Sequence, residues 1–258
     1  MSTTRALATF LAGALLLPAA CSAPGARVQL GYMQPSLTGS IGLSPSAGSG
    51  SGFTATVDVE DSLGLKDTAS TAQIHAELDA GPVRVTASAF RYSQSGNGTL
   101  QASFGDLSAG IDVTSDVDLT NAKVAVTFDL LDLGVVRISP GLGADLFKVQ
   151  ARVTEISTGT FEDVDELLPV PMLFLQSEGR FGPLSAELDL GYLDVDLGDT
   201  GGTYFDLEAL VAYDLTAQIE LNAGYRYISM DANGKSDGQD LTADLTLQGW
   251  FIGGGIRF

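Results

Sequence analysis

The sequence predicts an all-β protein, folded as a single antiparallel up-and-down β-barrel of about ten strands, with eight strands as the alternative. Three features lead to this prediction. Apolar and polar residues alternate with a period of two in successive blocks, the connections between blocks are of two lengths, and no sustained helical period follows Ala26. Because successive side chains point to opposite faces of a strand, these blocks are predicted to be strands with one apolar and one polar face.

The first residues have the layout of a secretory signal. Residues 1–5 are short and carry one positive charge, residues 6–17 are almost wholly apolar, and small residues follow at 19–23. This segment is too short to cross a bilayer as a helix, and no later apolar run approaches the length of about 18 residues that a membrane helix needs. We therefore predict a signal peptide over residues 1–23 and a transmembrane barrel over residues 24–258.

Cys21 is the only cysteine, and it lies where a lipoprotein signal carries its acylated cysteine. Pro18 stands where such signals usually have a large aliphatic residue. Two interpretations therefore remain: Cys21 is lipidated, or it is removed with the signal or left inert. A single cysteine forms no disulfide within the chain.

The clearest alternating block is 219–228, where Ile219, Leu221 and Tyr225 share one face while Glu220 and Arg226 share the other. The pattern recurs in further segments: 28–32, 72–79, 83–89, 121–129, 137–146, 184–192 and 205–214. The block 170–181 alternates less cleanly, and the block 250–258 ends the chain. Alternating segments of about ten residues, separated by turn residues, are typical of transmembrane strands.

The connections between these blocks are of two kinds. The short ones lie at 80–82, 132–134, 182–183 and 214–217. The longer ones, which are mostly polar and rich in Gly or Asp, lie at 36–70, 93–118, 155–169, 194–203 and 231–240. Short turns at one end and long loops at the other are typical of bacterial transmembrane barrels, with the short turns in the periplasm and the long loops outside. Four short turns imply five hairpins, hence ten strands with both ends of the barrel in the periplasm.

The end of the chain carries the most specific pattern. Trp250, Ile252, Gly254 and Ile256 alternate up to a final Phe258. Here the sequence resembles the superfamily of small outer-membrane β-barrels (OmpA-transmembrane-like and porin-like), whose last strand ends in Phe with apolar residues at every second position. Segments 58–65, 169–171 and 224–227 are similar to segments of such barrels. The resemblance implies insertion in the bacterial outer membrane after signal removal, and recognition by the barrel-assembly machinery. The predicted assembly signal comprises Trp250, Ile252, Ile256 and Phe258.

Aromatic residues gather near both ends of the blocks. Phe128, Phe181, Tyr213 and Phe258 lie beside short turns, and Tyr92, Tyr192, Phe205, Tyr227 and Trp250 lie near the long loops. The span from Trp250 to Phe258 measures roughly 20 Å along the axis of a barrel with strands tilted near 40°, which is close to the apolar band of about 25 Å. We therefore predict two aromatic girdles at the membrane interfaces.

Charges of both signs occupy the polar faces of the blocks. In a narrow barrel they face the lumen, where they must pair or be hydrated, because an unpaired buried charge is costly. The predicted lumen charges are Arg84, Lys123, Arg137, Arg180, Arg226, Glu77, Glu178, Glu187, Asp206, Glu208 and Glu220.

The sequence gives no pattern of a catalytic, metal or cofactor site. His75 is the only histidine and lies between Gln73 and Glu77 on the polar face of its block, which favours a hydrogen-bonded lumen residue over a catalytic base. One His and one Cys do not provide the ligands of a zinc site. The acidic segment 231–240 has the wrong spacing for a calcium loop, because Lys235 occupies a ligand position.

The chain carries 13 basic and 32 acidic residues, a net charge of −19 that disfavours nucleic acid as a partner. We expect a structural or surface-exposed, non-enzymatic barrel whose partners are outer-membrane lipid, lipopolysaccharide and, during assembly, the barrel-assembly machinery. Three alternatives remain: a narrow pore for small solutes or ions, a lipid-modifying enzyme around His75, and a surface lipoprotein with a soluble β domain. The sequence leaves the ligand and the oligomeric state open.

Overall fold

The computed structural model describes residues 25–45, 55–65, 68–196, 200–236 and 239–258. The predicted signal peptide and Cys21 lie outside these residues. All regular structure in the described part of the chain is β-strand. Among these residues there is no helix with the length and apolar character that a membrane crossing requires.

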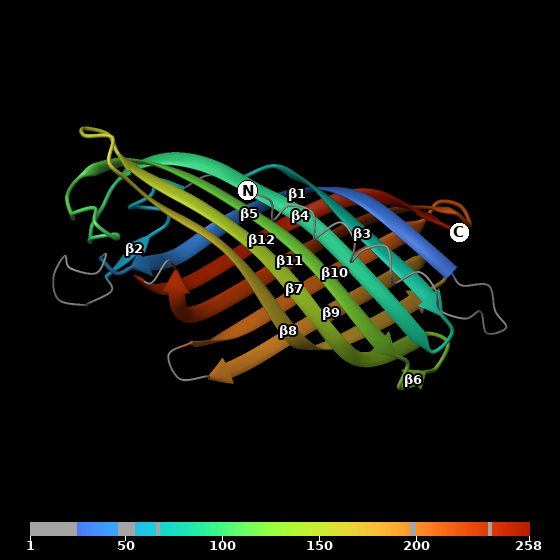
Figure 1. Cartoon of the computed structure of the whole chain (residues 1–258). Helices are drawn as coiled ribbons and strands as arrows, with labels where there is room; N and C mark the ends of the chain where they lie inside the picture. Colours follow the sequence, from blue (N-terminus) through green and yellow to red (C-terminus); the bar gives the residue numbers. More distant parts are fainter. Residues whose placement is uncertain (1–24, 46–54, 66–67, 197–199, 237–238) are drawn as a thin grey trace, which may run out of the picture.

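Ten long strands close into one barrel, and each is antiparallel to its two neighbours (Figure 1). In ring order they are β1 (Gly25–Leu43), β3 (Thr71–Ala80), β4 (Val83–Thr99), β5 (Asp112–Phe128), β7 (Val136–Glu155), β8 (Phe161–Phe181), β9 (Leu184–Asp196), β10 (Gly201–Asp214), β11 (Ile219–Ser236) and β12 (Gln239–Arg257). Two short strands lie beside the ring: β2 (Thr56–Asp58) pairs with β1, and β6 (Leu131–Asp132) pairs with β7. The predicted antiparallel barrel of ten strands is confirmed.

The two ends of the barrel chain meet at one rim. β12 pairs with β1, with Ile256 opposite Val28, and the backbone N–H of Phe258 donates to the carbonyl of Ala26 at 2.8 Å. All four short connections predicted from the sequence are turns at this same rim (Figure 1). Gly81 has a φ of 72° in the first of these turns, a left-handed conformation that favours glycine. Closure of the ring satisfies the backbone of the edge strands, as a membrane environment demands.

At the opposite rim the strands are longer than the sequence predicts. The segment 155–169, predicted as a long loop, consists of a turn at 156–160 followed by the start of β8. Likewise, strands include residues 36–43 and 56–58 of the segment 36–70, residues 93–99 and 112–118 of the segment 93–118, and the described residues of 231–240. The physical reason is that apolar and polar residues alternate in these segments too, but here the apolar side chains point inward and the polar ones point outward. This is a reversal of phase relative to the blocks near the turn rim.

The reversal divides the interior of the barrel into two zones. Near the turn rim, the side chains that point inward are polar or charged. Towards the other rim they are apolar and form a buried core that includes Met33, Leu37, Phe90, Tyr92, Val117, Leu119, Phe147, Val149, Val153, Phe174, Tyr204, Ile228, Met230, Leu245 and Leu247. We call these the charged zone and the apolar zone.

Two loops complete the apolar zone above β1–β5. Residues 55–65 bury Leu63 and Leu65, and residues 100–111 bury Phe104 and Leu107 in the same cluster. Backbone hydrogen bonds hold the second loop in place, since the N–H of Gly105 donates to the carbonyl of Leu43 at 3.0 Å. The loops therefore cover this side of the long-strand rim with an ordinary hydrophobic core.

Candidate functional site

The centre of the charged zone is a set of buried ion pairs around Arg226 on β11. Its guanidinium lies 3.1 Å from the Asp206 carboxylate and 3.5 Å from that of Glu208, both on β10. The Lys123 ammonium on β5 lies 2.9 Å from Asp206 and 3.2 Å from Glu208. All four side chains are at most 2% exposed, so each charge depends on its partners rather than on water.

A second set of ion pairs lies closer to the turn rim. Arg27 on β1 pairs with Glu77 on β3 at 2.8 Å and also with Glu187 on β9. Arg84 on β4 lies 3.0 Å from Glu178 on β8. The pair Arg27–Glu77 joins neighbouring strands, as the pairs of Arg226 with β10 do. The pairs Arg27–Glu187 and Arg84–Glu178, like those of Lys123 with β10, connect strands that are not neighbours in the ring and therefore cross the lumen.

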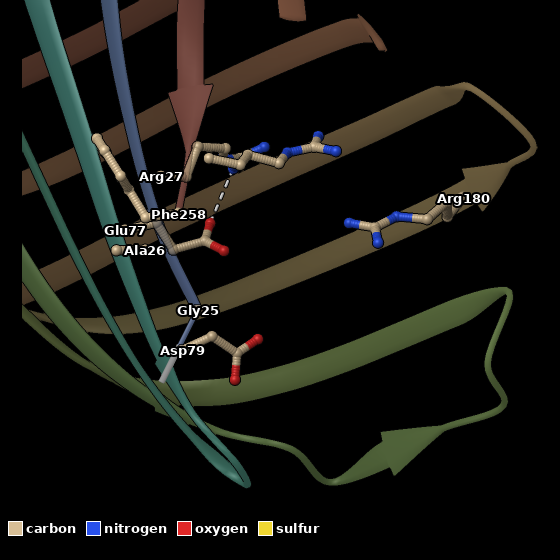
Figure 2. A pocket seen from close by; sticks show the side chains of 8 residues that line it. Gly25, Ala26, Arg27, Glu77, Asp79, Arg180 and Phe258 are labelled. Atoms are coloured by element: carbon tan, nitrogen blue, oxygen red, sulfur yellow. Dashed lines mark hydrogen bonds and ion pairs between the residues drawn. The ribbon is translucent and has the colours of Figure 1, made fainter. Parts of the chain in front are cut away.

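Further charges line the mouth at the turn rim, where a cavity of about 150 Å³ lies. Figure 2 shows the ion pair of Arg27 with Glu77 there, with Arg180 across the mouth. Arg180 is half exposed and pairs with Glu178 at 2.9 Å, while Arg137 pairs with Asp79 at 2.9 Å. These two arginines lie at the mouth, whereas Arg84, Lys123 and Arg226 lie deep in the lumen.

The last strand presents its apolar residues outward. Trp250 is 71% exposed and Phe258 78% exposed, and Ile252 and Ile256 lie on the same outer face. Arg257 points inward, 2.7 Å from Asp214 and 2.5 Å from Glu220. Its guanidinium is therefore neutralised on the lumen side while its neighbours face outward.

The aromatic residues near the long-strand rim do not all face outward. Tyr32, Tyr192 and Trp250 are exposed on the outer surface, and Tyr225 packs against Trp250. Tyr92, predicted to belong to this girdle, is fully buried in the apolar zone. The reason is the phase reversal, which on β4 turns Phe90 and Tyr92 inward.

An apolar cavity of about 650 Å³ lies in the apolar zone between β8 and β12. The inward faces of the strand ends provide its wall, with Leu168 and Val170 from β8, Leu193 from β9, and Met230 from β11. Tyr204 contributes to the lining and bonds Asp145 in the charged zone. The volume lies within the range of about 300–1,000 Å³ that is usual for small-molecule sites.

The barrel wall is split beside this cavity. β8 pairs with β9 only from Leu173, opposite Tyr192, to Phe181. Beyond that point β8 continues to Phe161 with β7 as its partner, while β9 continues to Asp196 with β10. Pro169 and Pro171 lie in the part of β8 that has no β9 partner, and proline blocks the pairing of a strand edge. The β9–β10 hairpin is also the shortest at this rim, so the wall is low where the cavity lies (Figure 1).

Comparison with known proteins gives likeness in structure but not in sequence. No protein-family model matches the chain, and no curated protein matches it. The outer membrane protease OmpT from Escherichia coli is similar in structure, with a TM-score of 0.61 over 91% of this chain and 96% of OmpT, at 11% identity. This chain has the fold of an outer-membrane β-barrel.

Two further proteins also match, with lower TM-scores. Ail, the attachment invasion locus protein of Yersinia pestis, gives 0.40 at 13% identity, covering 92% of this chain and all of Ail. Outer membrane protein AlkL gives 0.40 at 15% identity, covering 94% of this chain and 95% of AlkL. The outward apolar band agrees with the fold of an outer-membrane barrel. The short turns at one rim mark that rim as periplasmic and the long-strand rim as extracellular.

His75 lies in the charged zone of this outer-membrane barrel. It is buried, and its Nδ1 is 3.5 Å from a carboxylate oxygen of Glu208. The donor atoms of His75, Glu77 and Glu187 lie within 4.8 Å of one another, a spacing that could suit a metal ion. However, Arg27 pairs with both Glu77 and Glu187, and Arg84 lies 3.4 Å from Glu77, so two cations match the two carboxylates and we assign no metal there.

The sequence reasoning missed the apolar zone, its cavity and the split. A readable signal marks the zone: two adjacent large apolar residues where the alternation changes phase. The dipeptides are Tyr32–Met33, Leu146–Phe147, Leu173–Phe174 and Tyr227–Ile228, in each of which the first side chain faces outward and the second inward. The proline pair on β8 is the only sequence mark of the split.

Proposed function

We propose that the barrel is a closed, non-enzymatic outer-membrane protein whose function lies at its acidic extracellular end. The observation that supports this most directly is the set of buried ion pairs across the lumen. Lys123 on β5 bonds β10, Arg226 on β11 reaches Ser88 on β4 at 3.0 Å, and Arg84 on β4 reaches β8. Ten strands leave little lumen, and these side chains occupy it.

The position of His75 supports a non-enzymatic role. Its imidazole faces carboxylates that are held by Arg27, and Ser88, opposite it on β4, accepts a hydrogen bond from Arg226. The described apolar zone lies between His75 and the extracellular rim. A lipid or peptide from outside therefore has no short route to the only imidazole, and general-base catalysis needs direct contact or a single bridging water.

The extracellular end carries the charge that a partner would meet. Beyond the outer girdle, acidic side chains far outnumber basic ones. Among the residues that the structure describes there, the acidic ones are Asp58, Glu60, Asp61, Asp106, Asp112, Asp116, Asp118, Glu155, Glu162, Asp163, Asp165, Glu166, Asp194, Asp196, Asp231, Asp240 and Asp244, and the basic ones are Arg91, Lys148, Arg152 and Lys235. A surface of one sign attracts partners of the opposite charge.

Planar-bilayer recording tests whether the lumen is closed. The purified wild-type barrel should give no stable conductance steps, whereas Lys123→Ala combined with Arg226→Ala should give ion conduction, because two crossing side chains are lost. Arg152→Ala, outside the lumen, is the matched control and should remain silent. Heat-modifiable gel mobility checks that each variant is folded. Stable steps from the wild type would show that the barrel is a pore.

A further inference from the structure

We propose that the extracellular cavity binds a small cationic amphiphile, meaning a single apolar chain or ring that carries one positive charge. This deepens the proposed function, because it gives the acidic extracellular end a ligand class. The apolar half of the ligand is assigned by the cavity wall, where Leu168, Val170, Leu193, Met230 and Leu241 contribute inward side chains. Burial of such a chain removes its methylene groups from water, which favours binding.

The split between β8 and β9 gives this ligand a way in. Pro169 and Val170 line the cavity on one side of the split, and Leu193 and Val195 line it on the other. The split begins immediately beyond the pair Leu173–Tyr192, and Tyr192 belongs to the outer aromatic girdle. The opening is therefore at the level where the membrane surface meets water, which is where an amphiphile resides.

The charged residues at the rim of the cavity favour a ligand with a positive charge. Glu166 lies on the inward face of β8 and lines the cavity. The basic group at the rim, Lys235, is 3.6 Å from Asp240 and is matched by it. Together with the acidic excess of the whole extracellular end, this arrangement favours a cationic head group over an anionic one.

A binding experiment with three probes of equal chain length tests the proposal. The full chain is placed in lipid nanodiscs and titrated calorimetrically with octyltrimethylammonium, 1-octanol and octanoate, with empty nanodiscs as the reference. We expect saturable binding of octyltrimethylammonium, weaker binding of octanol, and the weakest binding of octanoate. The advantage of the cation over octanol should shrink as salt is raised, because salt screens exposed charges.

Matched variants locate the site. Ala243→Phe fills the cavity from the inward face of β12 and should weaken octyltrimethylammonium binding about tenfold or more, since the chain loses its space. Thr242→Phe, which places the same ring on the outer face, should leave binding unchanged. Glu166→Gln should weaken binding of the cation about two- to fivefold and leave octanol unaffected, whereas Asp165→Asn, on the outer face, should have no effect. Ala232→Phe fills the cavity from β11 and serves if Ala243→Phe does not fold.

Several results would overturn the proposal. These are no saturable binding of any probe, octanol or octanoate binding as tightly as the cation, or equal binding to the filled and wild-type cavities. The conductance test is independent of them. If the barrel gives no conductance and binds no probe, the ligand proposal is wrong and the closed lumen stands. If the barrel conducts and binds the cation, the closed lumen is wrong and the ligand proposal stands.

Discussion

The charged and apolar zones of the barrel wall are built from the same strands, but the polarity of their inner and outer faces is opposite. In the charged zone the outer surface is apolar, with Val124 and Leu142 exposed, and the interior holds Arg226 and its carboxylates. In the apolar zone the outer surface is polar and the interior is a hydrophobic core. The first arrangement suits a wall surrounded by lipid, and the second suits a wall surrounded by water.

The boundary between the zones is built from aromatic residues and cations. On the inside, the Phe174 ring lies 5.5 Å from the Lys123 ammonium, and the Phe90 ring lies 5.3 Å from the Arg226 guanidinium. On the outside, Tyr192 and Trp250 lie at about the same level. At the girdle the outer face of the strands therefore changes from apolar, which suits lipid, to polar, which suits water. One sheet can face both solvents because its alternation of apolar and polar residues shifts by one residue.

The largest expected effect is at the centre of the charged zone. Arg226→Ala leaves Asp206 and Glu208 with one cation fewer in a buried site, and should lower the free energy of unfolding by about 3–5 kcal/mol. Urea unfolding of the barrel in lipid vesicles, followed by tryptophan fluorescence, measures the loss. Arg152→Ala, whose partner Asp163 is exposed, should change stability by less than about 1 kcal/mol. Equal effects of the two changes would mean that the lumen charges are solvated.

An effect of intermediate size on stability is expected on the outer surface, where the same substitution should have different costs in the two zones. Val124→Arg places a cation on the lipid-facing side of the charged zone, and should cost about 2–4 kcal/mol. Thr246→Arg places the same cation on the outer face of the apolar zone, where water surrounds it, and should cost about 0–1 kcal/mol. The same unfolding measurement compares them. A similar loss of stability from Thr246→Arg would mean that lipid also surrounds the apolar zone, so that the two zones do not differ in their surroundings.

The smallest effect on stability is expected at the chain end. Deletion of Phe258 removes an exposed side chain, so the barrel refolded in detergent should unfold at nearly the wild-type urea concentration. In cells the folded fraction, seen as heat-modifiable mobility, should fall, because the residue belongs to the predicted assembly signal. Equal folded fractions in cells would count against that assignment.

Much of the charged zone could be predicted from the sequence, because its alternation runs unbroken through blocks such as 219–228. The alternation alone predicts that Arg226, Glu208 and Lys123 point into the lumen. Their partners do not, because ion pairs across the lumen depend on which strands face one another in the closed ring. The predicted role of His75 as a hydrogen-bonded lumen residue remains a prediction.

The apolar zone was hidden by the same alternation. Once the phase shifts at pairs such as Leu173–Phe174, the outward residues become polar and the segment looks like a hydrophilic loop. Proline also favours a loop over a strand, although Pro169 and Pro171 lie on a strand that has a single partner there. The cavity depends on the unequal lengths of β8 and β9, which no local pattern specifies.

Accessibility scanning along β11 tests the two-zone account most directly. Spin labels are placed one at a time at positions 221–231 in a Cys21→Ser background, and collisions with oxygen, which enters lipid, and with a polar nickel complex, which stays in water, are measured in vesicles. Labels at odd positions up to Tyr227 should favour oxygen, those at Ser229 and Asp231 should favour nickel, and those at even positions should be shielded from both. Odd positions that favour oxygen throughout, or even positions open to nickel near Met230, would contradict the account.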